Sequence, residues 1–131
     1  MAEQVQMLQS KIEEESKLLQ TLQREMQKYV EGRQKLIEQS HENEMVKKEL
    51  DLLEPEAKVY KLIASVLVSQ TLQESKENVS KRLDFIGKEF KKVEDLIKEN
   101  TNKQIAKKTS IQKMQEQLYQ IVQAYQQSLN K

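Results

Sequence analysis

The side chains in this sequence that could support catalysis or metal binding are one histidine and two serines. His41 is the only histidine, and its neighbours Glu42 and Glu44 complete no i, i+4 ligand set with a second His or Cys. Ser65 and Ser69 lie outside any nucleophile elbow, and the sequence has no Gly-rich phosphate loop. We therefore expect a solvated helical histidine, two hairpin serines and no enzyme, with no catalytic, cofactor or metal site.

The composition favours long helices over a compact core. Charged residues make up 33% of the 131 residues and aromatic residues 5%, with 2 Gly and 1 Pro in the whole chain. Turn residues are thus too scarce for many short elements, and the 37% of hydrophobic residues is below the usual share for a packed domain. A narrow apolar seam along long helices fits this composition better.

Charge and hydropathy exclude several classes of partner. The 22 Lys and Arg are interleaved with 21 Asp and Glu, so no basic stripe indicates nucleic acid or an anionic membrane. No apolar run approaches the roughly 20 residues of a membrane span, and residues 1–4 do not begin a signal peptide. The absence of cysteine is compatible with a reducing compartment. We expect a cytoplasmic protein with no nucleic-acid and no membrane partner.

Two long segments have the apolar periodicity of coiled-coil helices. Apolar residues recur at alternating steps of three and four over residues 2–51 and again over residues 71–128. Pro55 ends the first segment because it lacks a backbone N–H, and Thr71 with Glu74 forms a capping box that opens the second. The segments can fold back as an antiparallel pair, although each seam could instead belong to a parallel dimer of two chains.

If the ends at Asp51 and Thr71 lie level, facing residues have numbers that sum to about 122. This register places Glu15 opposite Lys107, so that two polar breaks in the seam pair with opposite charge. It also places Leu22 opposite Asn100, a poor match that we expect to loosen the coiled coil there.

The stretch between the helices, residues 59–70, has the residue types of a β-hairpin. Its β-branched and aromatic side chains suit a pleated surface, and Ala64-Ser65 divides it into two runs. A lone hairpin is marginally stable in water, and this one would expose apolar side chains and two unpaired edges. We therefore expect other subunits to cover it, through the assembly residues Val59, Tyr60, Leu62, Ile63, Val66, Leu67 and Val68.

A second apolar group lies near the two ends of the chain. In the antiparallel pair these residues would gather at the tip farthest from the hairpin, where they either complete the coiled coil or bind something apolar. The polar stretch 100–107 favours binding because it weakens the coil just before the tip. The candidate client-binding residues are Val5, Leu8, Ile12, Met114, Leu118, Ile121 and Tyr125.

Five segments between residues 32 and 97 have the sequence of a known family: Gly32–Leu36, Met45–Leu50, Val59–Ile63, Val66–Val68 and Lys81–Ile86. On these segments the chain resembles β-class prefoldin subunits. The family commonly has Gly-Pro before the second strand, where this chain has Ala64-Ser65.

The resemblance implies a mostly α fold for residues 1–131: a single prefoldin domain with a long antiparallel two-helix coiled coil joined by one β-hairpin. It implies a heterohexamer with other α-type and β-type prefoldin subunits, whose hairpins form a platform. It further implies ATP-independent binding of unfolded client polypeptides, actin and tubulin among them, and their transfer to the cytosolic chaperonin. Two other readings stay open: a structural coiled-coil adaptor, and a subunit of a prefoldin-like complex that acts in assembly of nuclear machinery.

Overall fold

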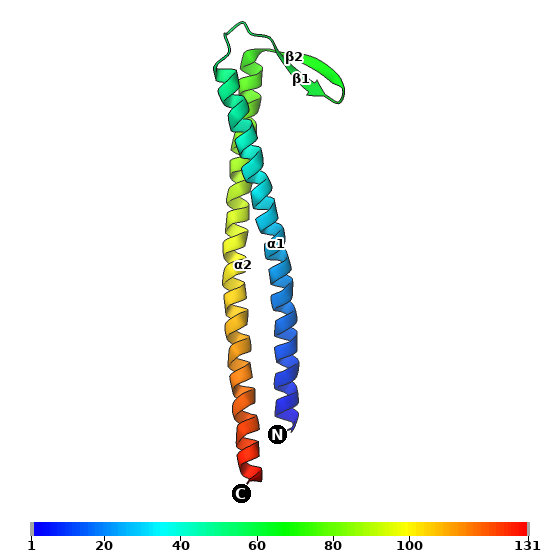
Figure 1. The fold of residues 1–131 in the computed structure, drawn as a ribbon, viewed down its shortest axis with the longest axis vertical. Helices are drawn as coiled ribbons and strands as arrows, with labels where there is room; N and C mark the ends of the chain where they lie inside the picture. Colours follow the sequence, from blue (N-terminus) through cyan, green and yellow to red (C-terminus); the bar gives the residue numbers. More distant parts are fainter. Residues whose placement is uncertain (1, 131) are drawn as a thin grey trace. The chain divides into compact units, whose positions relative to one another are not determined.

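The computed structural model describes residues 2–130, so the first and last residues of the predicted domain lie outside it. The predicted fold class is confirmed, because one antiparallel hairpin lies between two long helices (Figure 1). The elements are α1 (Ala2–Asp51), β1 (Val59–Ile63), β2 (Val66–Gln70) and α2 (Leu72–Leu129).

The chain divides into two compact units, each formed by facing stretches of α1 and α2. The hairpin unit is Glu31–Asp95 and contains both strands. The terminal unit combines the residues up to Val30 with those from Leu96 onward.

Helix α2 begins at a side-chain cap. The Glu74 N–H donates a hydrogen bond to Oγ1 of Thr71 at 3.1 Å, which satisfies one of the free donors of the first turn. Thr71 is therefore the cap itself, and α2 starts at Leu72. At the other boundary the N–H of Leu53 bonds to the carbonyl of Leu50 at 3.2 Å, a tightened last turn after which Pro55 prevents the helix from continuing.

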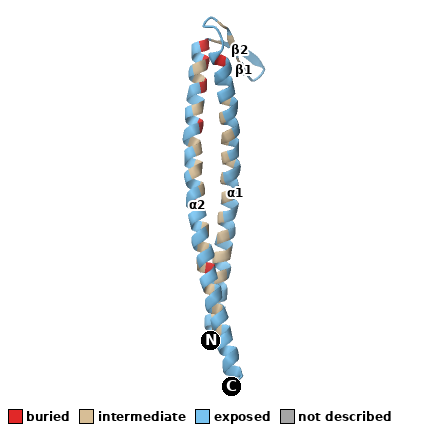
Figure 2. Cartoon of the chain, turned by 60° about the vertical axis from the view of Figure 1, so that its left-hand side comes forward, coloured by how far each residue is buried: buried red, intermediate tan, exposed pale blue. Residues whose placement is uncertain are grey.

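The core of the hairpin unit lies where the strands meet the helices. Leu50, Leu72 and Val79 are buried against one another, and Val59 and Leu83 pack on them. Figure 2 shows these buried positions in red beside the strands. The first residue of β1 is thus anchored in the chain's own core.

The terminal unit confirms the predicted register. Nζ of Lys107 lies 2.6 Å from Oε2 of Glu15, and that oxygen is fully buried. The two opposite charges form an ion pair between α1 and α2. The two charged residues that interrupt the apolar seams of α1 and α2 therefore pair with each other within one chain, as the antiparallel register predicts.

The expected loosening at Asn100 is wrong. This residue is only 3% exposed, and its Nδ2 donates a hydrogen bond to the Leu22 carbonyl oxygen at 3.0 Å. Nε2 of Gln104 in turn donates to Oδ1 of Asn100 at 2.6 Å. Burying an amide lowers stability only when the amide lacks a hydrogen-bond partner. These hydrogen bonds therefore let α1 and α2 pack together at a position where the apolar pattern indicates a mismatch. Periodicity could not show it, since one partner is a backbone carbonyl.

Replacing Lys107 with methionine tests the half-buried ion pair between Lys107 and Glu15. The carboxylate of Glu15 would stay in the seam without its counter-ion, so we expect the free energy of unfolding to fall by about 1–3 kcal/mol. Urea unfolding of the full chain, followed by helical circular dichroism, measures the change. Lys103→Met is the matched control, because Lys103 pairs with Glu99 on the exposed surface and should contribute less than about 0.5 kcal/mol. Equal effects of the two substitutions would contradict the prediction.

The hairpin turn contains a strained residue. Ile63 pairs with Val66, so the loop is the dipeptide Ala64-Ser65, and Ala64 has a φ of 53°. Ala64 is the only non-glycine residue within 2–130 with positive φ, a pattern of φ signs that matches a type II′ turn. A Cβ in this left-handed region is disfavoured by about 1–2 kcal/mol.

Ala64→Gly should therefore stabilise the hairpin. After the entropy that glycine adds to the unfolded chain, we expect a net gain of about 0.5–1 kcal/mol and amide exchange about threefold slower across residues 59–70. Hydrogen exchange by mass spectrometry measures it. Ser65→Gly is the control, since φ of Ser65 is not positive and the substitution should bring no gain. Unchanged or faster exchange in the Ala64 variant would refute the turn assignment.

Candidate functional site

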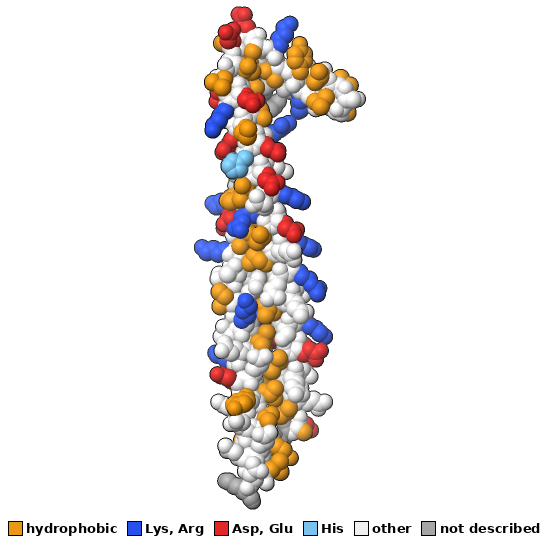
Figure 3. All heavy atoms as spheres, in the orientation of Figure 1, with side chains coloured by type: hydrophobic (Ala, Val, Ile, Leu, Met, Phe, Trp, Pro, Cys, Tyr) orange, Lys and Arg blue, Asp and Glu red, His pale blue; other side chains and the backbone are white. Residues whose placement is uncertain are grey.

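The outer face of the hairpin is the most exposed apolar surface of the two strands. Residues paired across an antiparallel ladder share a face, and Leu62 pairs with Leu67 while Tyr60 pairs with Ser69. Leu62 and Leu67 are each 66% exposed, and Tyr60 is exposed beside them. Figure 3 shows hydrophobic side chains over much of the hairpin surface. The apolar side chains of this face are therefore exposed and do not belong to the core of the hairpin unit.

The apolar side chains on the inner face of the hairpin become more exposed toward the loop. Val59 is half-buried on the helix core, whereas Val68, Ile63 and Val66 are 41%, 52% and 61% exposed in turn toward the loop. Of the seven predicted assembly residues, six are thus exposed, and Val59 belongs partly to the chain's own core.

Both edges of the sheet are open. Within residues 2–130 the sheet consists of β1 and β2 alone, so each strand has one edge without a strand partner. Open edges beside exposed Leu and Val side chains are a ready template for further strands. Each strand of the hairpin thus has a row of backbone groups without a strand partner within residues 2–130.

Sequence reasoning missed other exposed apolar residues in the hairpin unit. Leu52, just after α1, is 85% exposed, and Met45 and Leu53 are also exposed. Met45 lies on α1 outside the seam, and Leu52 and Leu53 follow the end of that helix. Apolar residues at positions outside the heptad seam were the signal that could have identified them.

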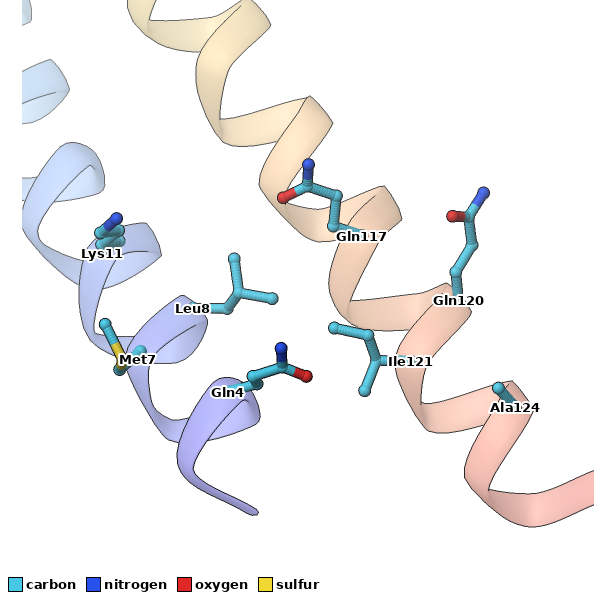
Figure 4. A pocket seen from close by; sticks show the side chains of 8 residues that line it. All are labelled: Gln4, Met7, Leu8, Lys11, Gln117, Gln120, Ile121 and Ala124. Carbon is cyan, nitrogen blue, oxygen red and sulfur yellow. The ribbon is translucent and has the colours of Figure 1, made fainter. Parts of the chain in front are cut away.

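The terminal unit contains a groove between α1 and α2 of about 490 Å³. Leu8 and Ile121 point toward one another across it, with Gln4 beside them (Figure 4). We call this the terminal groove, and its lining residues are Gln4, Met7, Leu8, Lys11, Gln117, Gln120, Ile121 and Ala124.

The predicted client-binding residues fall into three groups. Leu8 and Ile121 line the terminal groove, and Val5 and Tyr125 line a second groove together with Val122. The remaining three line neither of these grooves; Ile12, Met114 and Leu118 are half-buried along the helix pair.

Met7 is exposed in the terminal groove, but sequence reasoning passed over it because it lies outside the heptad seam. An apolar residue next to a seam residue, Leu8, in an otherwise polar turn was the available signal.

The candidate chemical residues form no catalytic constellation. His41 is exposed and lines a shallow groove of the hairpin unit together with Ser40 and Glu44. Across residues 2–130 there is no group of three or more His, Cys, Asp or Glu side chains arranged to hold a metal ion. In the same range, no helix has the length and apolar character that a membrane crossing requires.

Comparisons with known proteins agree with this architecture. The family model described as prefoldin subunit matches residues 13–125. The chain is 40% identical over 122 residues to a probable prefoldin subunit 6 of Caenorhabditis elegans, covering 93% of this chain and 97% of that protein. It is 42% identical over 114 residues to prefoldin subunit 6 of Arabidopsis thaliana, covering 87% and 88%.

A solved structure extends the similarity to the fold. The crystal structure of the prefoldin beta subunit from Thermococcus strain KS-1 matches with a TM-score of 0.73 at 19% identity, covering 79% of this chain and 90% of that one. At this identity the match supports the architecture of two helices and a hairpin. The family model and the two relatives each cover most of the sequence. The chain therefore belongs to the prefoldin subunit family.

Proposed function

We propose that this chain is a β-type subunit of a heterohexameric prefoldin that holds unfolded polypeptides in the cytoplasm and passes them to the cytosolic chaperonin. It does so without nucleotide or other cofactor and is not an enzyme. Actin-type and tubulin-type polypeptides are the clients that this function entails. Residues 1–131 act in it as a single prefoldin domain. The observation that carries the proposal is the open hairpin, whose exposed Leu62–Leu67 pair needs a cover.

Assembly follows from the energetics of that hairpin. A two-stranded sheet is marginal in water by itself, and only the Val59 end of this one is anchored on a helix core. Strands from neighbouring subunits would pair with both open edges and bury the leucine pair. Each leucine removed from water contributes about 1.5–3 kcal/mol. Association thus supplies the stability that the isolated hairpin lacks.

Client binding is supported by the terminal unit. Its two grooves are lined by Met7, Leu8 and Tyr125, and methionine adapts its shape to varied apolar partners. Each groove offers only a few apolar side chains, so we expect a single contact with a client to be weak. Several subunits that contact one unfolded chain raise the overall affinity through effective concentration.

Native mass spectrometry of the complex purified from its own cells tests the proposal. We expect six-subunit particles that contain this chain and other prefoldin subunits, and we expect these particles to suppress aggregation of a denatured client without ATP. A monomer or simple dimer that is stable without other subunits would overturn the proposal and favour an adaptor role. Co-purification with components of a nuclear assembly complex would instead assign the chain to a prefoldin-like complex.

A further inference from the structure

The hairpin unit contains a groove between α1 and α2 whose lining carries positive charge and no acidic side chain. It has a volume of about 390 Å³. Ile86 is 7% exposed and forms its floor, whereas Phe85 beside it is 64% exposed. We call this the basic groove, and its lining residues are Gln39, Asn43, Lys81, Arg82, Phe85 and Ile86. The groove thus presents two cations next to an exposed aromatic ring.

The two cations of the basic groove are not neutralised by the chain's own acids. Within residues 2–130 neither Lys81 nor Arg82 forms an ion pair. Arg82 has no carboxylate three or four residues away on α2, so its own helix offers it no partner. Glu77, one turn before Lys81, instead accepts a hydrogen bond from Nε2 of Gln73 at 3.3 Å. Both cations are exposed and therefore available to a carboxylate from outside the chain.

Helix α1 adds neutral amides and an apolar extension to this surface. Its two lining residues are Gln39 and Asn43, and Nδ2 of Asn43 donates a hydrogen bond to the Gln39 carbonyl oxygen at 2.8 Å. Val46 follows Asn43 by three residues, so it lies on the same side of α1, and it is 43% exposed. The surface therefore fits a ligand that is both negatively charged and partly apolar.

We propose that the basic groove docks a short acidic segment of another folded protein, with one large apolar side chain of that segment seated on Phe85 and Ile86. Carboxylates on either side of this anchor would pair with Lys81 and Arg82. A guanidinium binds a carboxylate through two parallel hydrogen bonds, which gives geometric selectivity as well as affinity. Docking here would recruit a partner to the hairpin unit, and it goes beyond the holding of unfolded clients.

The charge of the groove favours an acidic protein segment over nucleic acid. Affinity for nucleic acid grows with the number of phosphates that a protein neutralises, and this groove offers two cations. Over the whole chain 22 basic residues are interleaved with 21 acidic ones, so no longer basic track continues from the groove. Two cations around an aromatic ring instead match a few carboxylates around one apolar anchor.

Fluorescence anisotropy with the full chain tests the inference. The probe is a fluorescein-labelled peptide in which glutamates flank one central tryptophan. We expect a peptide with lysines in place of the glutamates, and another with alanine in place of the tryptophan, each to bind at least about tenfold more weakly. Affinity for the probe should fall at least about threefold between about 50 and about 500 mM NaCl, because salt screens exposed charges.

Two pairs of variants separate the groove from general surface effects. Arg82→Ala should weaken probe binding at least about fivefold, and Arg82→Lys should weaken it less, since lysine keeps the charge but loses the fork. Lys91→Ala is the charge-matched control, because Lys91 is an exposed cation of the same unit outside the groove. Phe85→Ala should also weaken binding at least about fivefold. Its control is Met45→Ala, which removes another exposed apolar side chain of this unit.

The same variants define the results that would overturn the basic groove as a docking site. Unchanged binding in Arg82→Ala or Phe85→Ala would do so, and so would equal losses in the two controls. Displacement of the probe by oligodeoxythymidine at a lower concentration than unlabelled peptide would assign the cations to nucleic acid instead. Binding to the free chain that disappears in the assembled hexamer would show that a neighbouring subunit covers the groove.

This inference and the proposed function fail in different measurements. Hexamers with Arg82→Ala should form and suppress aggregation of a denatured client as the unaltered hexamer does. A denatured client should not displace the probe from the hexamer, because the terminal groove belongs to the other unit. Displacement would overturn the separate docking site, whereas a chain that binds the probe but enters no hexamer would overturn the proposed function alone.

Discussion

The chain with Leu62→Asp should fold normally and fail to enter the hexamer. Leu62 is 66% exposed and pairs with Leu67 on the outer face of the hairpin, so a carboxylate there is hydrated in the free chain. In the assembly the same group would be buried against apolar residues without a counter-ion, at a cost of several kcal/mol. We expect hexamer yield in size-exclusion chromatography with the partner subunits to fall at least about tenfold.

Ile105→Asp is the matched control for this result. Ile105 is also an exposed apolar residue, 58% exposed on α2, but it lies in the terminal unit outside the two described grooves. Its substitution should leave hexamer yield unchanged. Val66→Asp should reproduce the loss, since Val66 is exposed next to the turn. A normal hexamer with Leu62→Asp would show that the outer face is not an assembly surface.

Val59→Asp should also abolish assembly, but for a mixed reason. Val59 packs on Leu50, Leu72 and Val79, so an aspartate there damages the chain's own core as well as the sheet. We expect this variant to lose helical circular dichroism signal or melt earlier, whereas Leu62→Asp should not. The comparison separates loss of folding from loss of association.

Ending the chain after Leu118 should spare assembly and weaken client binding. The truncation removes Gln120, Ile121 and Ala124 from the terminal groove and Tyr125 from the second groove. The hairpin and its core lie in the other unit and keep all their residues. We expect six-subunit particles of normal stoichiometry. The concentration of these particles that suppresses aggregation of a denatured client should rise at least about threefold.

A point variant makes the same test without shortening α2. Ile121→Asp places a carboxylate beside Leu8 in the groove and should weaken client binding in the same direction. Ile105→Asp is again the control, as an exposed apolar residue of the same unit outside both grooves. If neither the truncation nor Ile121→Asp alters suppression of aggregation, the terminal unit is not the client-binding surface.

Local chemistry predicted the elements because each signal lies within a few residues. Thr71 and Glu74 cap a helix wherever it occurs, and Pro55 stops one by lacking an N–H. The register followed from chain connectivity, since a short connection forces the helices to return side by side. The Glu15–Lys107 ion pair could therefore be predicted from residue numbers.

The sequence by itself determined two helices with apolar seams, an apolar hairpin and the pairing of Glu15 with Lys107. Periodicity and connectivity can both be read from the linear order of the residues. Only the tertiary structure decided which apolar residues are buried in the chain's own core and which remain exposed on its surface. It placed Val59 on the helix core and left Leu62 exposed, and it paired Asn100 with a backbone carbonyl. These outcomes depend on which groups meet across the two helices in space, and residue type alone does not carry that information.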